Sequence, residues 1–206
     1  MANTATAFGL RPIGLVGSAV NSTGVTEYEI ASNNTNAIFQ YGIVIPTGAG
    51  VIDQAGDTAG GTVAALGVLM GIMYQDATQK KPVWLNYWPG SAGVSVDTNY
   101  PVKAYVADNP DQLFQVASDA SLTNRATALT HVFSNASLGT SARVGSTANG
   151  NSNAALGVAT IVGIVDDEAN SDFTAAGIPY VVRLNAHFNS NASRFDSQTT
   201  SLTTGI

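Results

Sequence analysis

The amino-acid sequence predicts a mainly β fold whose strands form a barrel or a sandwich. Short segments alternate apolar and polar residues with a period of two, and clusters of turn residues separate them. Continuous apolar runs indicate further strands that are covered on both faces. The 206 residues suffice for a single β domain with its own core. We expect an extended N-terminal arm over residues 1–24, a β-rich core domain over residues 25–190 and a polar C-terminal tail over residues 191–206.

The arm is predicted from the stretch TATAFGLRPIGLVGSAVNSTG, residues 4–24. This stretch is too polar and too often interrupted by glycine for a membrane anchor, and it is too apolar for a solvated tail. An extended segment of this kind can add a strand to a neighbour's sheet through main-chain hydrogen bonds. Pro12 fixes the local backbone and lowers the entropy lost on docking. We therefore expect the arm to lie on another protein.

Alternation within residues 26–106 predicts three half-buried strands. Their expected inward-facing residues are Tyr28 and Ile30, then Phe39, Tyr41 and Ile43, and then Val102, Ala104 and Val106. Turn signals stand at residues 46–48, 109–111 and 177–179. Because the second of these separates two alternating segments, VKAYVADNPDQLFQV is predicted to be a β-hairpin.

A short internal repeat, which we call the echo, indicates two more hairpins. Ala64–Asp76 and Ala154–Glu168 both begin with Ala-Ala-Leu-Gly-Val, and both carry a later Gly-Ile pair. Each is followed by a strand that contains Pro and Leu-Asn, at Pro82–Trp88 and Pro179–Phe188. The shared order predicts two equivalent hairpins, with glycines that let the strands bend. A chance match in a chain rich in these residues is the alternative.

One segment, SLTNRATALTHVF, has helical spacing. The residues predicted to share one face are Leu122, Ala126, Leu129 and Phe133. Ser121 or Thr123 could cap its start. Thr and Asn are poor helix formers, so an irregular loop is the alternative to a short helix. Residues 135–155, which follow, are rich in Ser, Asn and Gly, and a structureless connection of that length indicates a binding role or mobility.

Charge and hydropathy argue against nucleic acid and membranes as partners. Charged residues make up 11% of the chain, and the net charge is −6. The only adjacent basic pair is Lys80–Lys81, whereas binding to a phosphate backbone needs clustered Lys and Arg. The longest apolar run, Val63–Tyr74, is far shorter than the roughly 20 residues of a membrane helix. We expect neither nucleic acid nor a membrane as a partner.

No pattern in the sequence indicates a catalytic or metal site. The two histidines, His131 and His187, accompany no Gly-x-Ser-x-Gly serine, and cysteine is absent. His187 lies in a predicted strand, which favours a packed or interface histidine. The acidic run Asp166–Asp172 lacks the glycine and terminal glutamate of a Ca²⁺ loop, so we interpret it as a solvated turn. We expect no enzyme activity, no metal and no cofactor.

The segment VWLNYW is the clearest candidate for contact with a partner. It places Trp84, Asn86 and Trp88 on one strand face. If the opposite face is core, both tryptophans are exposed unless a partner covers them, and tryptophan often anchors interfaces. The alternative is that both faces of this strand are buried inside the domain.

Several stretches together resemble a known family. These are TAFGLRPIG, TEYEIASNNTNAIFQYG, VKAYVADNPDQLFQV, and IVGIVDDEANSDF with YVVRLNAHF. The chain is similar to the small capsid cement or decoration proteins of tailed bacteriophages, found in podovirus-like and marine or cyanobacterial phages. The resemblance spans most of the chain. Its most specific motifs are Phe8-Gly9-Leu10-Arg11-Pro12 and Leu184-Asn185-Ala186-His187.

The resemblance implies a β-barrel or β-tulip-like virion protein on the outer surface of the phage head, made in the cytoplasm of the host bacterium. Such proteins commonly form homotrimers and bridge neighbouring major capsid proteins, which stabilises the capsid. No catalytic residues come with the resemblance. The residues that we expect at capsid or subunit interfaces are Phe8, Leu10, Arg11, Pro12, Trp84, Trp88, Arg143 and His187. Two alternatives stay open: a host-binding adhesin or fibre module with the Ser/Asn-rich loop as its tip, and a small hydrolase on a β scaffold.

Overall fold

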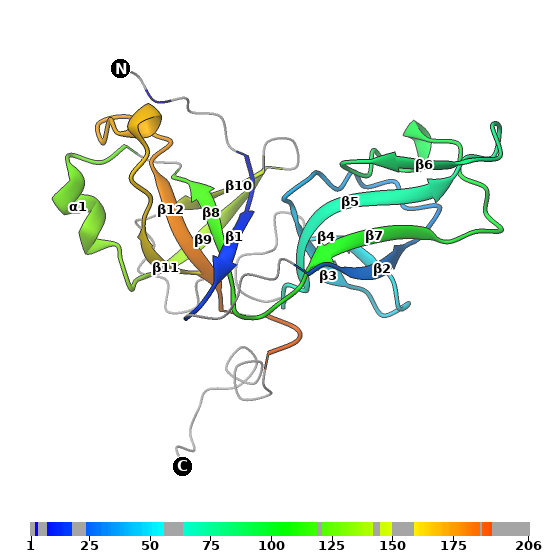
Figure 1. Cartoon of the computed structure of the whole chain (residues 1–206), viewed down its shortest axis with the longest axis horizontal. Coiled ribbons are helices and arrows are strands. Elements are labelled where there is room, and N and C mark those ends of the chain that lie inside the picture. Colours follow the sequence, from blue (N-terminus) through cyan, green and yellow to red (C-terminus); the bar gives the residue numbers. More distant parts are fainter. Residues whose placement is uncertain are drawn as a thin grey trace, which may run out of the picture.

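The computed structural model describes residues 3, 8–17, 24–55, 64–118, 121–141, 145–149, 159–185 and 187–190, and the statements that follow concern these residues. Of these described residues, 43% lie in strands and 8% in helices, arranged as two sheets and one α-helix. The predicted mainly β fold with one short helix is confirmed. The two sheets lie beside each other, and each contributes to a buried apolar cluster (Figure 1).

One sheet closes into a small barrel. Its strands follow the order β3 (Ile43–Pro46), β4 (Ile52–Gln54), β2 (Thr26–Ile30), β7 (Val102–Ala107), β5 (Gly67–Gln75) and β6 (Pro82–Leu85). The start of β5 also pairs with β3, at Ile43↔Val68 and Val44↔Gly67, which closes a ring of β3, β4, β2, β7 and β5. Farther along, β5 pairs with β6. The short 3₁₀ helix η2 (Ser91–Gly93) follows β6.

Alternating side chains fill the barrel interior. On β7, Val102, Ala104 and Val106 are at most 1% exposed. Glu27 and Glu29 on β2 are exposed, whereas Ile30 is buried, as the sequence predicts. Burying one such valine or isoleucine side chain contributes roughly 1.5–3 kcal/mol to the free energy of unfolding. The alternation predicted through Phe39, Tyr41 and Ile43 is wrong, because Tyr41 has a φ of 62° and turns the chain before β3 begins.

The other sheet packs against the outside of the barrel. Its strands follow the order β1 (Arg11–Leu15), β8 (Gln112–Ala117), β12 (Pro179–Leu184), β11 (Ala159–Ile164), β9 (Asn135–Ser141) and β10 (Gly145–Asn149). Phe114 and Tyr180 from this sheet share a buried cluster with Ile43 of β3 and Val68 of β5. The barrel strands β3 and β5 therefore contribute side chains to both cores.

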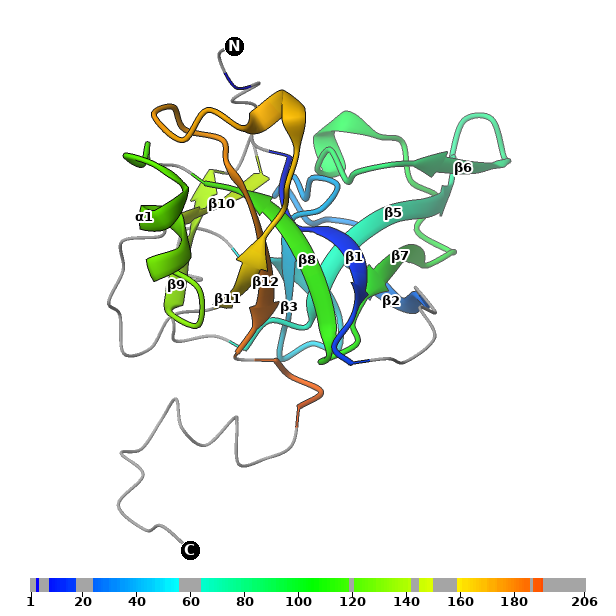
Figure 2. The same cartoon turned by 60° about the vertical axis from the view of Figure 1, so that its left-hand side comes forward.

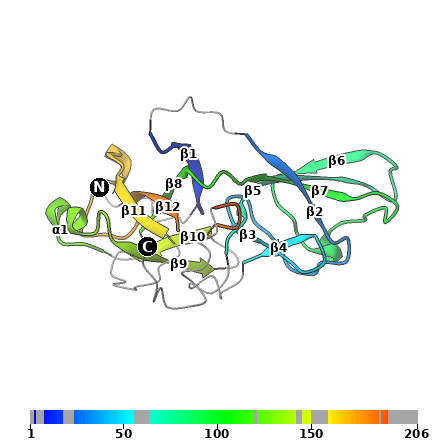
Figure 3. The same cartoon turned by 90° about the horizontal axis from the view of Figure 1, so that it is seen from below.

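The predicted hairpin VKAYVADNPDQLFQV is wrong, although its turn exists. The Gln112 N–H donates to the Asn109 carbonyl at 3.0 Å, and the Asn109 side chain accepts from the Asp111 N–H at 2.8 Å. However, β7 pairs with β2 and β5, whereas β8 pairs with β1 and β12. Both edges of each strand are thus occupied, and the turn carries the chain from one sheet to the other (Figures 1 and 3).

The two echoed segments form the predicted hairpins, β5–β6 and β11–β12. Each has a register shift at its Gly-Ile pair, between Leu69 and Gly71 against β7 and between Ile161 and Gly163 against β12. The two hairpins join their sheets through different strands. The first strand of one hairpin, β5, pairs with β7, whereas the second strand of the other, β12, pairs with β8. Within residues 135–155, β9 and β10 also pair as an antiparallel hairpin, so this connection is not structureless over its described part.

The predicted N-terminal arm belongs in part to the domain. Arg11–Leu15 is extended, as expected, but it pairs with β8 of the same chain (Figure 2). Leu10 is fully buried in the core of that sheet. Gly9 has a φ of 77°, and a Cβ there would lie 2.6 Å from the Tyr41 carbonyl oxygen, so the chain approaches Tyr41 more closely than another residue allows. The predicted C-terminal tail, residues 191–206, lies outside the described residues.

The helix α1 (Arg125–Thr130) occupies the predicted segment, but its cap and buried face differ. Asn124 is the N-cap, and its side chain accepts from the Thr127 N–H at 3.0 Å. Ala128 is the buried residue, whereas Leu129 is 49% and Phe133 is 83% exposed. The helix is too short for a long apolar stripe, so the sheet accepts one small side chain from it.

Candidate binding surface

The structure separates the eight predicted interface residues into three groups. Leu10, Trp88 and His187 are at most 1% exposed and lie inside the molecule, so their side chains offer no contact surface. Phe8, Arg11, Pro12 and Trp84 reach the surface to different degrees, and Arg143 lies outside the described residues. At the N-terminal group, the Arg11 guanidinium lies 4.8 Å from the centre of the Phe8 ring.

Trp84 is an exposed aromatic residue on a strand of the barrel. It lies on β6 opposite Met73 of β5, and it is 53% exposed. Its ring lies over Gly71, where a Cβ would meet the ring atom Cζ2 at 2.5 Å. The ring also contacts Tyr105 of β7, with centroids 5.0 Å apart and planes inclined by 42°. A glycine and a tyrosine on two strands thus set the position of this indole.

Three charged side chains share the outer face of the barrel with this pair. Glu27 is directly opposite Tyr105, and Glu29 is directly opposite Lys103. The Lys103 ammonium lies 2.8 Å from the Glu27 carboxylate, and this hydrogen bond raises the pKa of Lys103. We call the set Glu27, Glu29, Gly71, Trp84, Lys103 and Tyr105 the aromatic face.

A second aromatic pair is formed by a residue before β3 and a residue after β6. Phe39 and Tyr87 stack with ring centroids 5.8 Å apart and planes inclined by 7°. Gln40, beside Phe39, donates to the carbonyl of Met70, the residue before Gly71.

Trp88 does not join Trp84 at the surface, and the prediction that they share an exposed face is wrong. Strand β6 ends at Leu85, so the alternation of faces stops before Trp88. Trp88 pairs with Ile38 through backbone hydrogen bonds, and its indole N–H donates to the Asn34 carbonyl at 3.1 Å. Trp88 is therefore a core residue. For this residue the alternative interpretation, burial inside the domain, is the correct one.

His187 belongs to a junction between the two sheets. It bridges to Ala65, and the Asn189 N–H donates to its Nδ1 at 3.1 Å. The Asn189 side chain donates to the Asp108 carboxylate, which also accepts from Tyr28 of the barrel. An accepting Nδ1 places the proton of the neutral ring on Nε2, which is buried and has no partner among the described residues. Burial lowers the pKa of His187.

The other histidine has a partner that sequence analysis missed. His131, which caps the end of α1, lies with its Nδ1 3.0 Å from the Tyr180 hydroxyl of β12. Desolvation raises the pKa of Tyr180 to about 12. The contact ties the helix to the sheet, and 49 residues separate the two in sequence.

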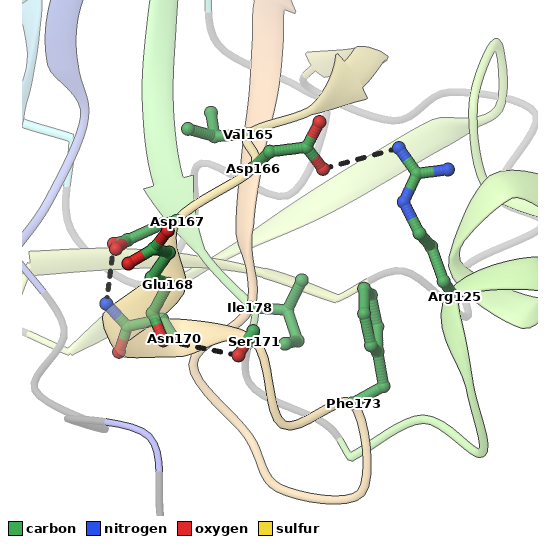
Figure 4. A pocket seen from close by; sticks show the side chains of 9 residues that line it. All are labelled: Arg125, Val165, Asp166, Asp167, Glu168, Asn170, Ser171, Phe173 and Ile178. Carbon is green, nitrogen blue, oxygen red and sulfur yellow. Dashed lines mark hydrogen bonds and ion pairs between the residues drawn. The ribbon is translucent and has the colours of Figure 1, made fainter. Parts of the chain in front are cut away.

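A hollow of 420 Å³ lies beside the 3₁₀ helix η3 (Glu168–Asn170). Figure 4 shows the side chains that line it. Val165, Phe173 and Ile178 supply its apolar lining, and Arg125, which also lines it, lies 3.3 Å from Asp166. Both of these side chains are exposed, so the pair contributes little to stability. The Asp167 carboxylate accepts from the Ala169 N–H and the Asn170 side chain, which holds the turn. The acidic run is therefore an exposed turn, as the sequence predicts. The described residues contain no group of three or more His, Asp and Glu side chains placed to hold a metal ion.

The sequence indicated Trp84 but missed the residues that position it. The usable signals were Tyr105, which alternates outward between inward Ala104 and Val106, and Gly71 of the echoed Gly-Ile pair. Among the helices that the structure describes, none has the length and apolar character to span a membrane. Comparison of the chain with protein-family models, with curated proteins and with solved structures gave no match.

Proposed function

We propose that this chain is a virion structural protein, a capsid decoration protein that binds the outer surface of a phage head and stabilises contacts between major capsid proteins. The observation that carries the proposal is the half-exposed Trp84 held on the outer wall of the barrel. The family resemblance of the sequence supplies the identity of the partner, a major capsid protein.

The aromatic face has properties that favour protein–protein contact. Tryptophan and tyrosine are the side chains most enriched at energetic hot spots of interfaces. Gly71 and Tyr105 restrict the Trp84 ring before any partner arrives. The entropy lost on binding is therefore smaller than for a freely rotating side chain.

Decoration as a homotrimer would multiply a weak contact. Each subunit contributes one aromatic face, and a trimer that engages several capsid subunits gains from effective concentration. A protein that binds the assembled shell and not its separated subunits shifts the equilibrium toward the shell by mass action. The stabilisation of the head needs no chemical step.

The proposal is tested by adding the purified protein to phage heads that lack it. We expect co-sedimentation with the heads at a copy number near that of the coat subunit, and heads that release their DNA at a higher temperature. Trp84→Ala should weaken binding about tenfold or more. Phe133→Ala removes an 83% exposed aromatic side chain that follows α1, and it should bind like the original chain. Helix α1 lies at the end of the molecule away from β6, the strand of Trp84 (Figure 1).

Two outcomes would contradict the proposal. Heads that remain bare at micromolar protein would exclude decoration. A virion that carries only a few copies, located at the tail, would favour the adhesin or fibre module instead.

A further inference from the structure

We propose that the aromatic face receives a cationic side chain of its partner, an arginine above all, which stacks on Trp84 and bonds to the carboxylates of β2. This inference rests on the proposed function for the identity of the partner, and its chemistry can be tested on the isolated protein.

The charges of the aromatic face leave one carboxylate in excess. Lys103 lies between two glutamates and bonds to Glu27 at 2.8 Å. Glu29 is exposed and has no ion pair among the residues that the structure describes. The chain as a whole carries a net charge of −6, so its field also attracts cations.

The rings and the carboxylates lie close enough for one side chain to reach both. Glu27, Tyr105 and Gly71 stand directly opposite one another on β2, β7 and β5, and the Trp84 ring lies over Gly71. Directly opposed residues on neighbouring strands have Cβ atoms about 5 Å apart. The row from Glu27 to the ring over Gly71 therefore spans roughly 10 Å, which matches an extended arginine laid along it. Glu29 lies in the neighbouring row, two residues farther along β2 and opposite Lys103.

A guanidinium matches this arrangement better than an apolar or neutral group. It is planar and stacks on an aromatic face, where the negative ring quadrupole attracts it. Its N–H groups donate to a carboxylate at the same time. An apolar partner would instead place Glu27, Glu29 and Lys103 in a desolvated interface without new partners.

The test uses acetylated hexa-arginine as the probe, with a neutral oligosaccharide of six glucose units as the comparison. The chain has two tryptophans, so two indole N–H signals report separately on exposed Trp84 and buried Trp88. We expect hexa-arginine to shift the Trp84 indole signal saturably, to leave the Trp88 signal in place and to bind more weakly as salt rises.

Fluorescence anisotropy of labelled hexa-arginine measures the affinities of the variants. Trp84→Ala should weaken binding about tenfold, and Glu29→Gln about twofold to fivefold. Glu168→Gln removes an exposed carboxylate at the distant turn η3 and should bind like the original chain. Gly71→Ala should weaken binding by displacing the Trp84 ring, whereas Gly163→Ala, where a Cβ meets nothing within 4 Å, is its matched control.

Three results would overturn the inference: no shift of the Trp84 signal, equal affinity for the Trp84→Ala variant, or a shift produced by the oligosaccharide and not by hexa-arginine. The two proposals fail separately. If heads bind the original chain but not the Trp84→Ala variant, and hexa-arginine does not bind, the decoration proposal stands and the proposal of a cationic partner side chain is wrong. If hexa-arginine binds at Trp84 but phage heads remain bare, the cation site stands and the decoration proposal is wrong.

Discussion

Leu10→Ala tests whether the N-terminal segment is part of the folded domain. Leu10 is 0% exposed and contacts the core shared by β8, β11 and β12. Replacing a fully buried leucine by alanine costs about 2–5 kcal/mol of the free energy of unfolding. For a chain of this size each kcal/mol lowers Tm by roughly 2–4 °C, so we expect a decrease of roughly 4–20 °C in thermal unfolding followed by circular dichroism.

Ile13→Ala is the matched control in the same segment. Ile13 is 38% exposed, so the same number of carbon atoms is removed from a site that the core encloses only in part. The expected cost is about 1 kcal/mol. Equal Tm values for the two variants would refute the structural assignment of Leu10. So would a truncation of residues 1–17 that unfolds like the full chain, which is the result that a free arm predicts.

Three further predictions concern pH, backbone strain and helix capping. Burial lowers the pKa of His187 below its unfolded value of about 6.5, so the unfolded chain binds a proton that the folded chain excludes. Stability in urea unfolding should be fully present above that value and fall as pH decreases toward the folded pKa, and the His187→Gln variant should lack this part of the slope. Gly90→Ala should cost roughly 1–3 kcal/mol, because φ is 88° and a Cβ would lie 2.6 Å from a carbonyl oxygen; Gly48→Ala, where a Cβ meets nothing within 4 Å, should be close to neutral in the same assay. Asn124→Ala should cost about 1 kcal/mol by loss of the N-cap, whereas an unchanged Tm for Asn124→Ala and a lower one for Thr123→Ala would move the cap to the residue that the sequence suggested.

Much of the secondary structure could be predicted from local patterns. The outward glutamates of Thr26–Ile30, the inward residues of Val102–Val106 and the two echoed hairpins depend on neighbouring residues in the chain. The Asn109-Pro110-Asp111 turn is local in the same sense. Period-two alternation and turn chemistry act over a few residues, so one sequence suffices to recognise them.

The candidate binding surface could be predicted only in part. Trp84 was indicated because it alternates within a strand, but its neighbours Gly71 and Tyr105 come from β5 and β7. Trp88, four residues later, lies in the core because the strand ends between the two tryptophans. The alternation of residues in β6 predicts which side chains share a face, but it does not predict the residue at which the strand ends.

By itself the sequence determined the two echoed hairpins, the turn at Asn109–Asp111 and the apolar side of β2 and β7. Only the tertiary structure decided that β7 and β8 separate into different sheets, that Leu10 enters a core and that β3 closes a barrel against β5. The physical reason is that an edge of a strand can be satisfied by any other strand with free N–H and C=O groups. The choice among those strands depends on how well whole faces pack together, which no short stretch of sequence specifies.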